Sequence, residues 1–378
     1  MSALFLDSAT PAAEVVTAAR CAMNGTGPVL ALGAPVADDT SLPAGTIAVV
    51  TTSGSSGVPK SVILSRSALT ASAMATADRL GAGEWMLTLP PTYVAGLQVI
   101  IRSLVQGHDP VVLDGHFSPD AFVDTAGRMH AMADGAPVPR FVSLVPAQLQ
   151  TLLDAADDPA VAGTGRSFRA MLVGGQAVAP ALRERAREEG WRIVRTYGST
   201  ETSGGCVYDG RALDRVSLRI VDGELQVAGP TLADGYLGEP ERTDAAFLTD
   251  ADGVRWYRTG DAGALTEDGV LSITGRLDNV IISGGVNVSL DRVERVVRAI
   301  PGFEDAVVVG AGHERWGQVP VVVTARTENA DALARVRDAV EPEVGVAGRP
   351  DRIVVVAEIP RLASGKPDRR ALTALVAR

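Results

Sequence analysis

Hydrophobic residues along the first half of the chain fall into short runs and helical stripes that follow one another. Short apolar runs predict strands at residues 46–50, 61–64, 85–91, 111–113, 141–145, 169–173 and 191–196. Helical spacing predicts helices over residues 12–22, 67–80 and 93–106, and helices that begin at Ser118, Pro146 and Pro180. Ser67 is the expected N-cap of its helix. Because strands and helices alternate, we expect an α/β fold with a mostly parallel, helix-covered sheet.

The pattern changes near Val216. Short alternating runs separated by Asp-Gly turns at residues 222–223, 252–253 and 268–269 predict antiparallel hairpins. Further strands are predicted at 280–282, 306–309, 319–324 and 352–357, with helices from Ser289, over 331–340 and at the end of the chain. We therefore expect two domains. Residues 1–277 form a large N-terminal domain of helix-covered sheets plus a β-rich subdomain, and residues 278–378 form a small α+β C-terminal domain.

Composition narrows the class of protein. The chain has 378 residues, is 46% hydrophobic and carries a net charge of −10, so a nucleic-acid-binding basic face is not expected. Its two cysteines, Cys21 and Cys206, do not suggest disulfides. No apolar run reaches the length of a membrane-spanning helix, and the N-terminus lacks a basic leader. These features favour a cytoplasmic protein without an integral membrane segment.

The segment from Thr52 to Lys60 concentrates the groups that hold a polyphosphate. Glycines let the backbone turn its N–H groups toward a ligand, and the hydroxyls and the lysine add donors and a positive charge. The glycine spacing differs from that of the NTPase P-loop. A flexible Ser/Gly linker is the alternative. The candidate phosphate-binding residues are Thr52, Ser53, Gly54, Ser55, Ser56, Gly57 and Lys60.

The use of lysine supports a binding role for this segment. Of the 35 basic residues, only Lys60 and Lys366 are lysines, and both lie beside Ser/Gly pairs. Lysine is a compact point charge on a flexible stem, whereas arginine is a wide planar fork. Two sites that require the compact charge would explain this distribution, although chance would also produce it.

Arg102 is the single charged residue of the apolar helix predicted over residues 93–106. One interpretation is a surface arginine that lays its stem along the helix and its head in water. The other is a pocket residue that pairs with a carboxylate. The helical pattern alone does not decide between them.

The order of motifs along the chain resembles the acyl-adenylate-forming superfamily, which includes acyl-CoA ligases, adenylation domains and luciferases. Within it, the chain is most similar to the actinobacterial o-succinylbenzoate–CoA ligases of menaquinone biosynthesis, through residues 89–97, 171–175 and 196–210. That family often has histidine where this chain has Tyr93. The superfamily motifs are residues 52–60, 197–202, 257–261, 275–278 and 360–366.

The resemblance implies a two-step reaction. A carboxylate attacks the α-phosphorus of ATP in the presence of Mg²⁺, and the thiol of coenzyme A then displaces AMP. The implied acid is o-succinylbenzoate. A carrier-protein thiol as acceptor, another aryl or acyl acid, and a catalytically silent nucleotide-binding module are the alternatives. The expected partners are these small molecules, and the oligomeric state stays open, a homodimer included.

The resemblance also implies roles for individual residues. Lys366, Thr200 and Glu201 are the expected catalytic residues, and Glu201 is the expected Mg²⁺ ligand. Asp278 is the expected hinge between the domains, and Gly284 and Gly285 are expected near coenzyme A. The remaining ATP- and AMP-binding residues are Gly174, Gly175, Gln176, Tyr197, Gly198, Asp261 and Arg276, and the acyl-binding residues are Tyr93, Gly96, Arg102 and Gly198.

Overall fold

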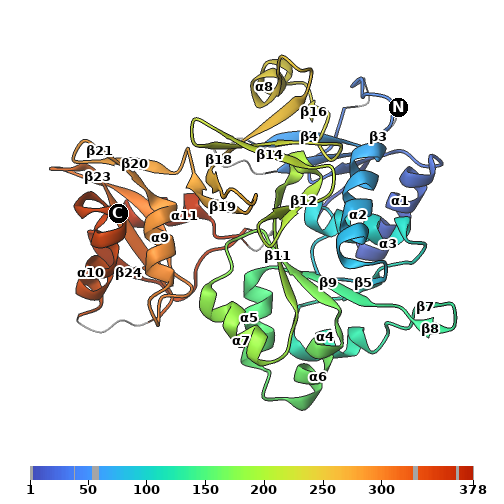
Figure 1. Ribbon diagram of the computed structural model, residues 1–378, viewed down its shortest axis with the longest axis horizontal. Coiled ribbons are helices and arrows are strands. Elements are labelled where there is room, and N and C mark those ends of the chain that lie inside the picture. The colour runs from blue at the N-terminus through green and yellow to red at the C-terminus, as the bar shows by residue number, and fades with distance from the viewer. Residues whose placement is uncertain (1–2, 38, 53–58, 327–330, 363–365, 378) are drawn as a thin grey trace. The chain divides into compact units, whose positions relative to one another are not determined.

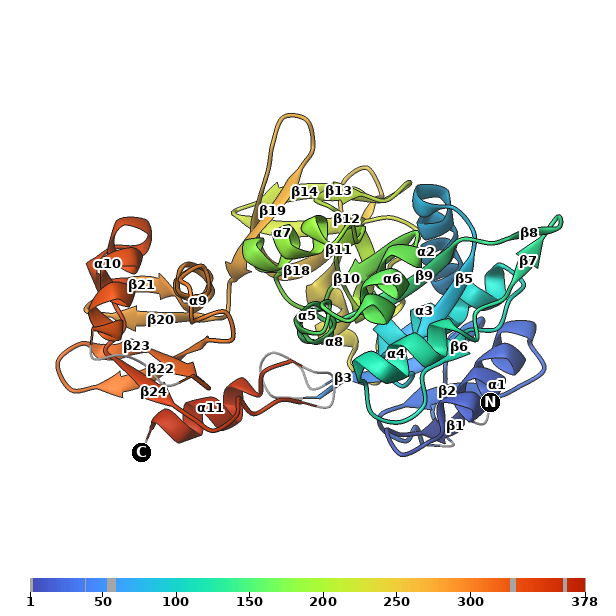
Figure 2. The same ribbon diagram turned by 90° about the horizontal axis from the view of Figure 1, so that it is seen from below.

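The computed structural model describes residues 3–37, 39–52, 59–326, 331–362 and 366–377 (Figures 1 and 2). The chain folds into two compact units. Unit 1 comprises residues 1–178, 182–219 and 226–258, and unit 2 comprises residues 179–181, 220–225 and 259–378. None of the described helices is long and apolar enough to cross a membrane.

Unit 1 contains two sheets with parallel cores. The first has strand order β1-β2-β3-β4-β16, with β1, β2 and β3 parallel and β4 and β16 antiparallel to their neighbours. Its strands are β1 (Ala3–Leu6), β2 (Val29–Leu32), β3 (Thr46–Thr52), β4 (Lys60–Ser65) and β16 (Gly235–Tyr236). The sequence pattern did not predict β1, β2 or β16.

The second sheet has order β13-β12-β11-β10-β9-β5-β6 and is parallel from β6 to β11. This pairing confirms the mostly parallel sheet that the alternation of strands and helices predicts. Its strands are β5 (Glu84–Leu87), β6 (Val111–Val112), β9 (Arg140–Leu144), β10 (Ala170–Val173), β11 (Ile193–Ser199), β12 (Gly204–Tyr208) and β13 (Arg211–Ala212).

Three helices connect the two sheets of unit 1. Helix α2 contacts β4 of the first sheet and β12 of the second, α1 contacts β2 and β3, and α3 packs on both helices and on β5, β9 and β12. Figure 1 shows α4 to α7 gathered on the side of the second sheet away from α2 and α3. The helices of unit 1 are α1 (Ala12–Asn24), α2 (Arg66–Leu80), α3 (Val94–Val105), α4 (Pro119–Ala126), α5 (Pro146–Asp154), α6 (Pro159–Ser167), α7 (Pro180–Glu188, begun in residues assigned to unit 2) and α8 (Pro240–Ala246).

The antiparallel region predicted after Val216 is confirmed, because β17 and β19 each pair antiparallel with β18.

The short β7 and β8 form a separate hairpin within unit 1. The bounds are β7 (Met132–Ala133), β8 (Ala136–Pro137), β14 (Ser217–Val221), β15 (Glu224–Ala228), β17 (Phe247–Thr249), β18 (Arg255–Leu265) and β19 (Leu271–Arg276).

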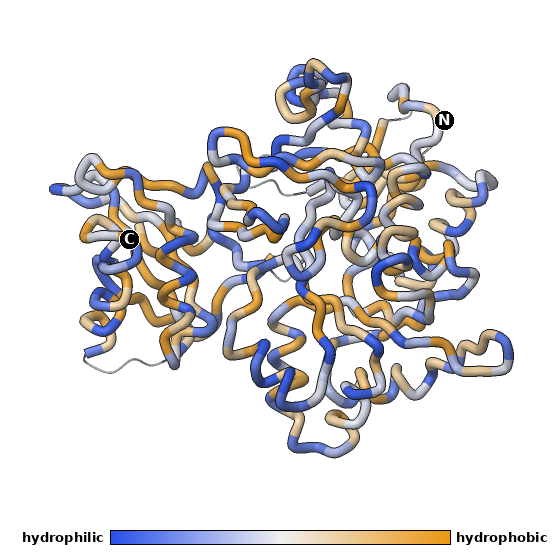
Figure 3. Tube along the Cα trace, in the orientation of Figure 1, coloured by the Kyte–Doolittle hydropathy of each residue, from blue (hydrophilic) through white to orange (hydrophobic). Residues whose placement is uncertain are grey.

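The C-terminal part of unit 2 is an α+β body around one sheet of order β21-β20-β23-β22, with β24 beside β23. Alternate residues of β22 face opposite sides: Val308 packs with α9 and α10, whereas Val307 and Val309 pack with α11. In Figure 3 these strands carry hydrophobic colours. The elements are β20 (Val280–Ser283), β21 (Val286–Ser289), α9 (Leu290–Arg298), β22 (Val307–His313), β23 (Gly317–Thr324), α10 (Ala332–Val344), β24 (Arg352–Val355) and α11 (Arg369–Val376).

The helix predicted to be capped by Ser67 begins two residues earlier than that cap implies. The N-cap of α2 is Ser65, whose Oγ accepts a hydrogen bond from the Ala68 N–H at 3.3 Å. Because β4 runs directly into α2, the last strand residue also caps the helix, and Ser67 lies in the first turn. The strand predicted over residues 85–91 is likewise shorter, since β5 ends at Leu87 before Pro90 and Pro91, which have no N–H for a strand ladder.

Helix α6 supplies a matched test of its packing. A Cβ at Gly165 would lie 2.2 Å from Trp191 Cε2, whereas no atom lies within 4 Å of a Cβ at Gly163 in the same helix. We expect Gly165→Ala to lower the free energy of unfolding by about 1–3 kcal/mol through overpacking. Gly163→Ala should raise it by up to about 1 kcal/mol through helix propensity. Urea unfolding of both variants measures the difference, and equal effects would contradict the close contact.

Candidate active site

The predicted phosphate-binding segment joins two paired strands. Strands β3 and β4 are antiparallel, with Thr52 opposite Lys60, and Thr52 Oγ1 lies 3.5 Å from the Lys60 carbonyl oxygen. The candidates Ser53, Gly54, Ser55, Ser56 and Gly57 lie outside the described residues. The strand pairing therefore fixes where this segment begins and ends on unit 1.

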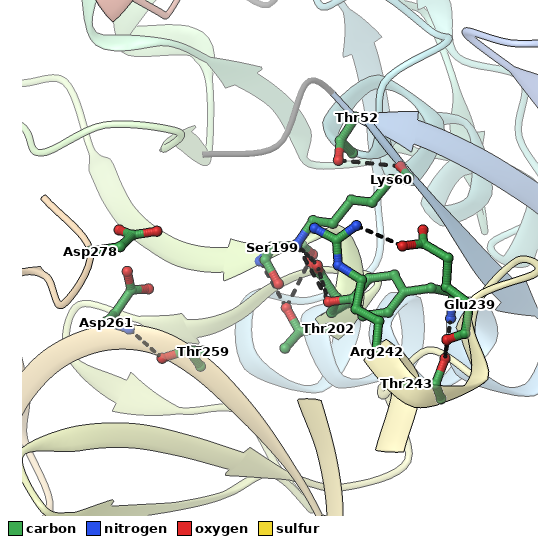
Figure 4. Close-up of polar contacts among 12 residues, drawn as sticks. Thr52, Lys60, Ser199, Thr202, Glu239, Arg242, Thr243, Thr259, Asp261 and Asp278 are labelled. Atoms are coloured by element: carbon green, nitrogen blue, oxygen red, sulfur yellow. Dashed lines mark hydrogen bonds and ion pairs between the residues drawn. The ribbon is translucent and has the colours of Figure 1, made fainter. Parts of the chain in front are cut away.

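Lys60, Glu201 and Tyr236 form a polar cluster inside unit 1. Lys60 Nζ makes an ion pair with Glu201 Oε1, and the Tyr236 hydroxyl donates to the same carboxylate oxygen at 2.9 Å. Lys60 Nζ also lies 3.4 Å from Tyr236 Oη. In Figure 4 the Lys60 side chain extends toward the turn that holds Ser199 and Thr202. Glu201 thus has two donors, although its residue is only 2% exposed.

Three short elements bring this cluster together. Tyr236 lies on β16, opposite Val62 of β4, and so comes beside the strand that begins with Lys60. Glu201 lies in the 3₁₀ turn Thr200–Thr202, whose Glu201 carbonyl accepts from the Ala233 N–H at 2.8 Å. The sequence motifs predict Lys60 and Glu201 as site residues, but no motif contains Tyr236. Its signal was weak, because a two-residue strand has no hydrophobic periodicity to find.

The charge of Glu201 depends on its partners. Burial acts to raise the pKa of this carboxyl, but the charge and hydrogen bond of Lys60, together with Tyr236, outweigh it and hold the pKa below its ordinary value. Burial and the neighbouring carboxylate raise the pKa of Tyr236, so its hydroxyl stays protonated and remains a donor. The cluster therefore keeps an ionised carboxylate in a buried position.

The two predicted glycine-containing loops follow neighbouring strands. The segment with Gly174, Gly175 and Gln176 comes after β10, and β10 pairs in parallel with β11, which runs into Ser199. A Cβ at Gly174 would lie 2.2 Å from Thr196 Oγ1, so any larger residue there would force the Thr196 side chain on β11 to move. Both loops accordingly leave the same edge of the sheet.

The second loop is held by its own side chains. The Ser199 N–H donates to Thr202 Oγ1 at 2.9 Å, and Thr202 Oγ1 donates to the Gly204 carbonyl at 2.8 Å. Tyr197 is half-buried at the end of β11, Gly198 is exposed and Thr200 is buried. Tyr197, Gly198, Thr200 and Glu201 thus follow one another around a turn whose shape is held by hydrogen bonds of Thr202.

Helix α3 carries the predicted acyl-binding residues. Tyr93 is its N-cap residue, and a Cβ at Gly96 would lie 2.2 Å from the Pro90 carbonyl oxygen. Glycine at position 96 is thus needed for the helix to pack against the Pro90–Pro91 segment. The structure explains this glycine by packing and does not test a contact with an acyl group.

Arg102 is buried, so the surface interpretation of this arginine is wrong. Its residue is 4% exposed, and its guanidinium carbon lies 5.0 Å from the centroid of the Trp85 ring. The Nη2 of Arg102 donates to Tyr208 Oη at 3.2 Å, and Tyr208 Oη lies 2.9 Å from Thr76 Oγ1. Within the described residues its Nε has no hydrogen-bond partner and no carboxylate pairs with it. The described part of the chain therefore supplies no counter-charge to this buried cation.

Unit 2 holds the other predicted nucleotide-binding residues. Arg276 Nη1 lies 3.1 Å from Asp261 Oδ1, and Arg276 Nε lies 3.0 Å from Asp278 Oδ1. The Arg276 N–H donates to Asp291 Oδ2 at 2.7 Å. The carboxylates predicted for the ribose and the hinge, Asp261 and Asp278, thus both pair with Arg276.

The remaining predictions in unit 2 fall on turns. Gly284 and Gly285 connect β20 and β21 with φ of +58° and +83°, and the Gly284 N–H donates to the Trp316 carbonyl at 2.9 Å. Lys366 is exposed, and its carbonyl accepts from the Leu362 N–H at 2.8 Å. The turn explains why glycine occupies both positions of the β20–β21 connection.

The chemistry of Glu201 suits magnesium. Mg²⁺ prefers hard oxygen ligands and is often bound by one or two carboxylates together with substrate phosphates and water. Among the described residues there is no cluster of three or more acidic, histidine or cysteine side chains that could hold a metal by itself. A buried, ionised carboxylate beside the phosphate-binding segment fits a metal that arrives with a polyphosphate.

The Lys60–Glu201 pair leads to a pH-dependent prediction. In Lys60→Met, Glu201 stays buried without its cation, so its pKa should rise above the unfolded value and its charge should destabilise the fold at neutral pH. We expect the variant to unfold more easily at pH 7.5 by about 2 kcal/mol, less than is typical of a fully buried pair because Lys60 is partly exposed.

Urea unfolding measured at pH 7.5 and at pH 5 checks this. In wild-type protein, ionised Glu201 stabilises the fold above the pKa that this carboxyl has in the unfolded chain, and this stabilisation is lost as the pH falls through its pKa in the folded protein. In the variant, the charge of Glu201 destabilises the fold, and this effect disappears when Glu201 is protonated. The difference in the free energy of unfolding between wild type and variant should therefore be smaller at pH 5 than at pH 7.5. Adding Glu201→Gln to Lys60→Met should recover much of the loss. A gap of equal size at both pH values would contradict the proposed coupling.

Comparisons with known proteins agree with this geometry. A relative from Mycobacterium tuberculosis, named a probable 2-succinylbenzoate–CoA ligase, is 38% identical over 349 residues, which are 91% of this chain and 86% of the relative. The structure of o-succinylbenzoate CoA synthetase from Bacillus subtilis, solved with the acyl-adenylate intermediate, matches with a TM-score of 0.72 and 28% identity, over 88% of this chain and 70% of that one.

Two further structures extend the comparison. The same Bacillus subtilis synthetase with ATP and a magnesium ion matches with a TM-score of 0.72 and 27% identity, over 90% of this chain and 72% of that one. An amide bond synthetase from Marinactinospora thermotolerans matches with a TM-score of 0.75 and 28% identity, over 100% of this chain and 80% of that one.

The family models cover both parts of the chain. The model of the AMP-binding enzyme matches residues 6–237, and the model of the AMP-binding enzyme C-terminal domain matches residues 292–366. These residues include the predicted nucleotide-binding turns of unit 1 and, in the α+β body of unit 2, the elements from within α9 to β24. The chain therefore belongs to the family of AMP-binding enzymes.

Proposed function

We propose that this protein is an ATP-dependent ligase that adenylates 2-succinylbenzoate and transfers the acyl group to coenzyme A. The relatives named above support the reaction, and Arg102 supports the acid. 2-Succinylbenzoate has two carboxylates, of which one reacts with ATP and the other keeps its charge. A buried guanidinium that has no carboxylate partner among the described residues is suited to that second charge.

The proposal assigns the first step to groups of both units. Lys60 and the segment that precedes it hold the outer phosphates of ATP, Thr200 contacts the α-phosphate, and Lys366 brings a positive charge to the reacting centre. Magnesium bound by Glu201 and the phosphates offsets negative charge at the phosphoryl oxygens. The protein's own contribution is positioning and electrostatic stabilisation, because the carboxylate itself is the nucleophile.

The proposal assigns nucleotide recognition to the loop after β10 and to the arginine cluster of unit 2. Gly174, Gly175 and Gln176 flank adenine, and Tyr197 stacks on it. Asp261 accepts hydrogen bonds from the ribose hydroxyls. Arg276, which lies 3.1 Å from Asp261 Oδ1, is close enough to that carboxylate to contact the same nucleotide.

The second step requires a different arrangement of the domains. We propose that residues 278–378 rotate about Asp278 after the first step, so that Lys366 leaves and the Gly284–Gly285 turn approaches coenzyme A. The use of ATP and coenzyme A agrees with the cytoplasmic location that the sequence predicts. A homodimer remains a prediction.

The direct test is product formation. Wild-type protein with ATP, Mg²⁺ and 2-succinylbenzoate should exchange pyrophosphate, and addition of coenzyme A should give the thioester. A holo-carrier protein and a primary amine serve as competing acceptors. Product with the carrier or the amine but not with coenzyme A would replace the proposed second step, and no exchange with this acid would overturn the proposed substrate.

Arg102→Met should weaken the acid substrate and spare ATP. Loss of a desolvated charge partner typically costs about 2–5 kcal/mol, which is roughly thirty-fold or more in kcat/KM for the acid. Steady-state kinetics with each substrate varied separately measures the effect. Arg128→Met is the control, because Arg128 donates to the Val112 carbonyl at the surface. An unchanged kcat/KM for the acid in Arg102→Met would remove Arg102 from the acyl site.

Lys366→Ala should separate the two half-reactions. Loss of one charge that stabilises the transition state commonly costs about 10²–10³-fold in rate, so pyrophosphate exchange should fall by that factor. Thioester formation from supplied acyl-adenylate should be largely unchanged. Arg370→Ala, which removes another exposed charge close in sequence, should leave both half-reactions intact. Equal losses in the two half-reactions would contradict the role of Lys366.

A further inference from the structure

Gln98 is a buried amide to which the described residues give no hydrogen-bond partner. It lies in α3, is 1% exposed, and neither its Nε2 nor its Oε1 has a hydrogen-bond partner within the described residues. A buried amide normally has its donors and acceptors satisfied, because leaving them unmade costs free energy. By contrast, the buried Gln226 accepts from Arg219 Nε at 2.9 Å. Gln98 therefore does not serve the fold through hydrogen bonds in the way that Gln226 does.

The position of Gln98 connects two parts of the candidate active site. Gln98 and Arg102 are four residues apart on α3 and lie one helical turn from each other on the same face. Both face β12: a Cβ at Gly204 would lie 2.9 Å from Gln98 Cγ, and Arg102 donates to Tyr208. Gly204 begins β12, and only Ser203 separates it from the turn that contains Thr200 and Glu201. Gln98 thus lies against the strand between the reacting end of the site and the buried cation.

The chemistry of the acid gives this amide a partner. In 2-succinylbenzoate a ketone separates the benzoate carboxylate from the carboxylate of the succinyl chain. An acid that places one carboxylate at the Thr200 turn and the other at Arg102 must pass its ketone oxygen between them. That oxygen is a hydrogen-bond acceptor, and an amide Nε2 is a neutral donor that suits it.

We propose that Gln98 is a specificity-determining residue that donates a hydrogen bond from its amide to the ketone oxygen of the acid substrate. This inference rests on the proposed function and adds to it. The ligase then recognises a keto diacid by two groups of α3, the guanidinium for the charge and the amide for the carbonyl. An acid of the same length and charge without the ketone leaves the amide unpaired and is bound less well.

The experiment compares two acids in pyrophosphate exchange. One is 2-succinylbenzoate and the other is 2-(3-carboxypropyl)benzoate, in which a methylene replaces the ketone. Wild-type protein should prefer the keto acid in kcat/KM by about tenfold to a hundredfold, the range typical of an unmade buried hydrogen bond. In Gln98→Met the ratio should approach one, with the KM for ATP unchanged. In Gln98→Asn, whose side chain is one methylene shorter, the ratio of kcat/KM for the two acids should lie between the wild-type value and one.

Thermal unfolding separates this role from a structural one. Replacing an unpaired buried amide by an apolar side chain of similar shape is nearly neutral or stabilising, so Gln98→Met should keep or raise Tm while it loses the preference. The control Gln226→Leu removes a hydrogen-bonded amide, so it should lower Tm and leave the preference for the keto acid unchanged. If Gln98→Met does not fold, the ratio of Gln98→Asn alone decides.

Each outcome bears on one assignment. An unchanged preference in an active Gln98 variant, or equal losses with both acids, overturns the role of Gln98 and leaves the proposed function standing. No preference for the ketone in wild-type protein also overturns it. No exchange by wild-type protein with either acid overturns the proposed function, and the inference with it.

Discussion

The candidate active site depends on how buried charge is balanced. A carboxylate that leaves water loses its hydration, and it stays ionised only when nearby donors replace the water. Glu201 receives these donors from Lys60 and Tyr236, which the pairing of β4 with β16 brings together. The short β16 is therefore as necessary to the charge of Glu201 as the turn that carries it.

Helix α3 presents the opposite case. Arg102 and Gln98 are buried as deeply as Glu201, but the described residues supply no carboxylate to the first and no hydrogen bond to the second. Fully satisfied polar groups rigidify a core, whereas unsatisfied ones lower its stability. Natural proteins tolerate such groups mainly where function requires them. Under the proposed function, the satisfied cluster would serve the metal and phosphates, and the unsatisfied groups of α3 would serve the acid.

Much of this arrangement could be predicted from the sequence, because it is local. The apolar run of α3, the glycine-containing turns after β10 and β11, and the Asp-Gly hairpins each have a pattern in neighbouring residues. What could not be predicted depends on contacts between distant residues. Tyr236 meets Glu201 only through a strand of two residues, and Arg102 could be read as a surface or a pocket residue until its burial was known. The cap at Ser65 was missed because a strand and a helix share that residue.

The two lysines gain a physical explanation from this balance. At position 60 the side chain pairs with a buried carboxylate at the end of the predicted phosphate-binding segment, and a compact ammonium on a flexible stem can move between two anions. The planar fork of arginine would favour a fixed bidentate pair with Glu201 and hold the carboxylate away from a metal. Arg276 is an example of such fixed pairing, because its guanidinium contacts the carboxylates of both Asp261 and Asp278. Under the proposed function, a chain that otherwise uses arginine would therefore keep lysine where a charge has to change partners.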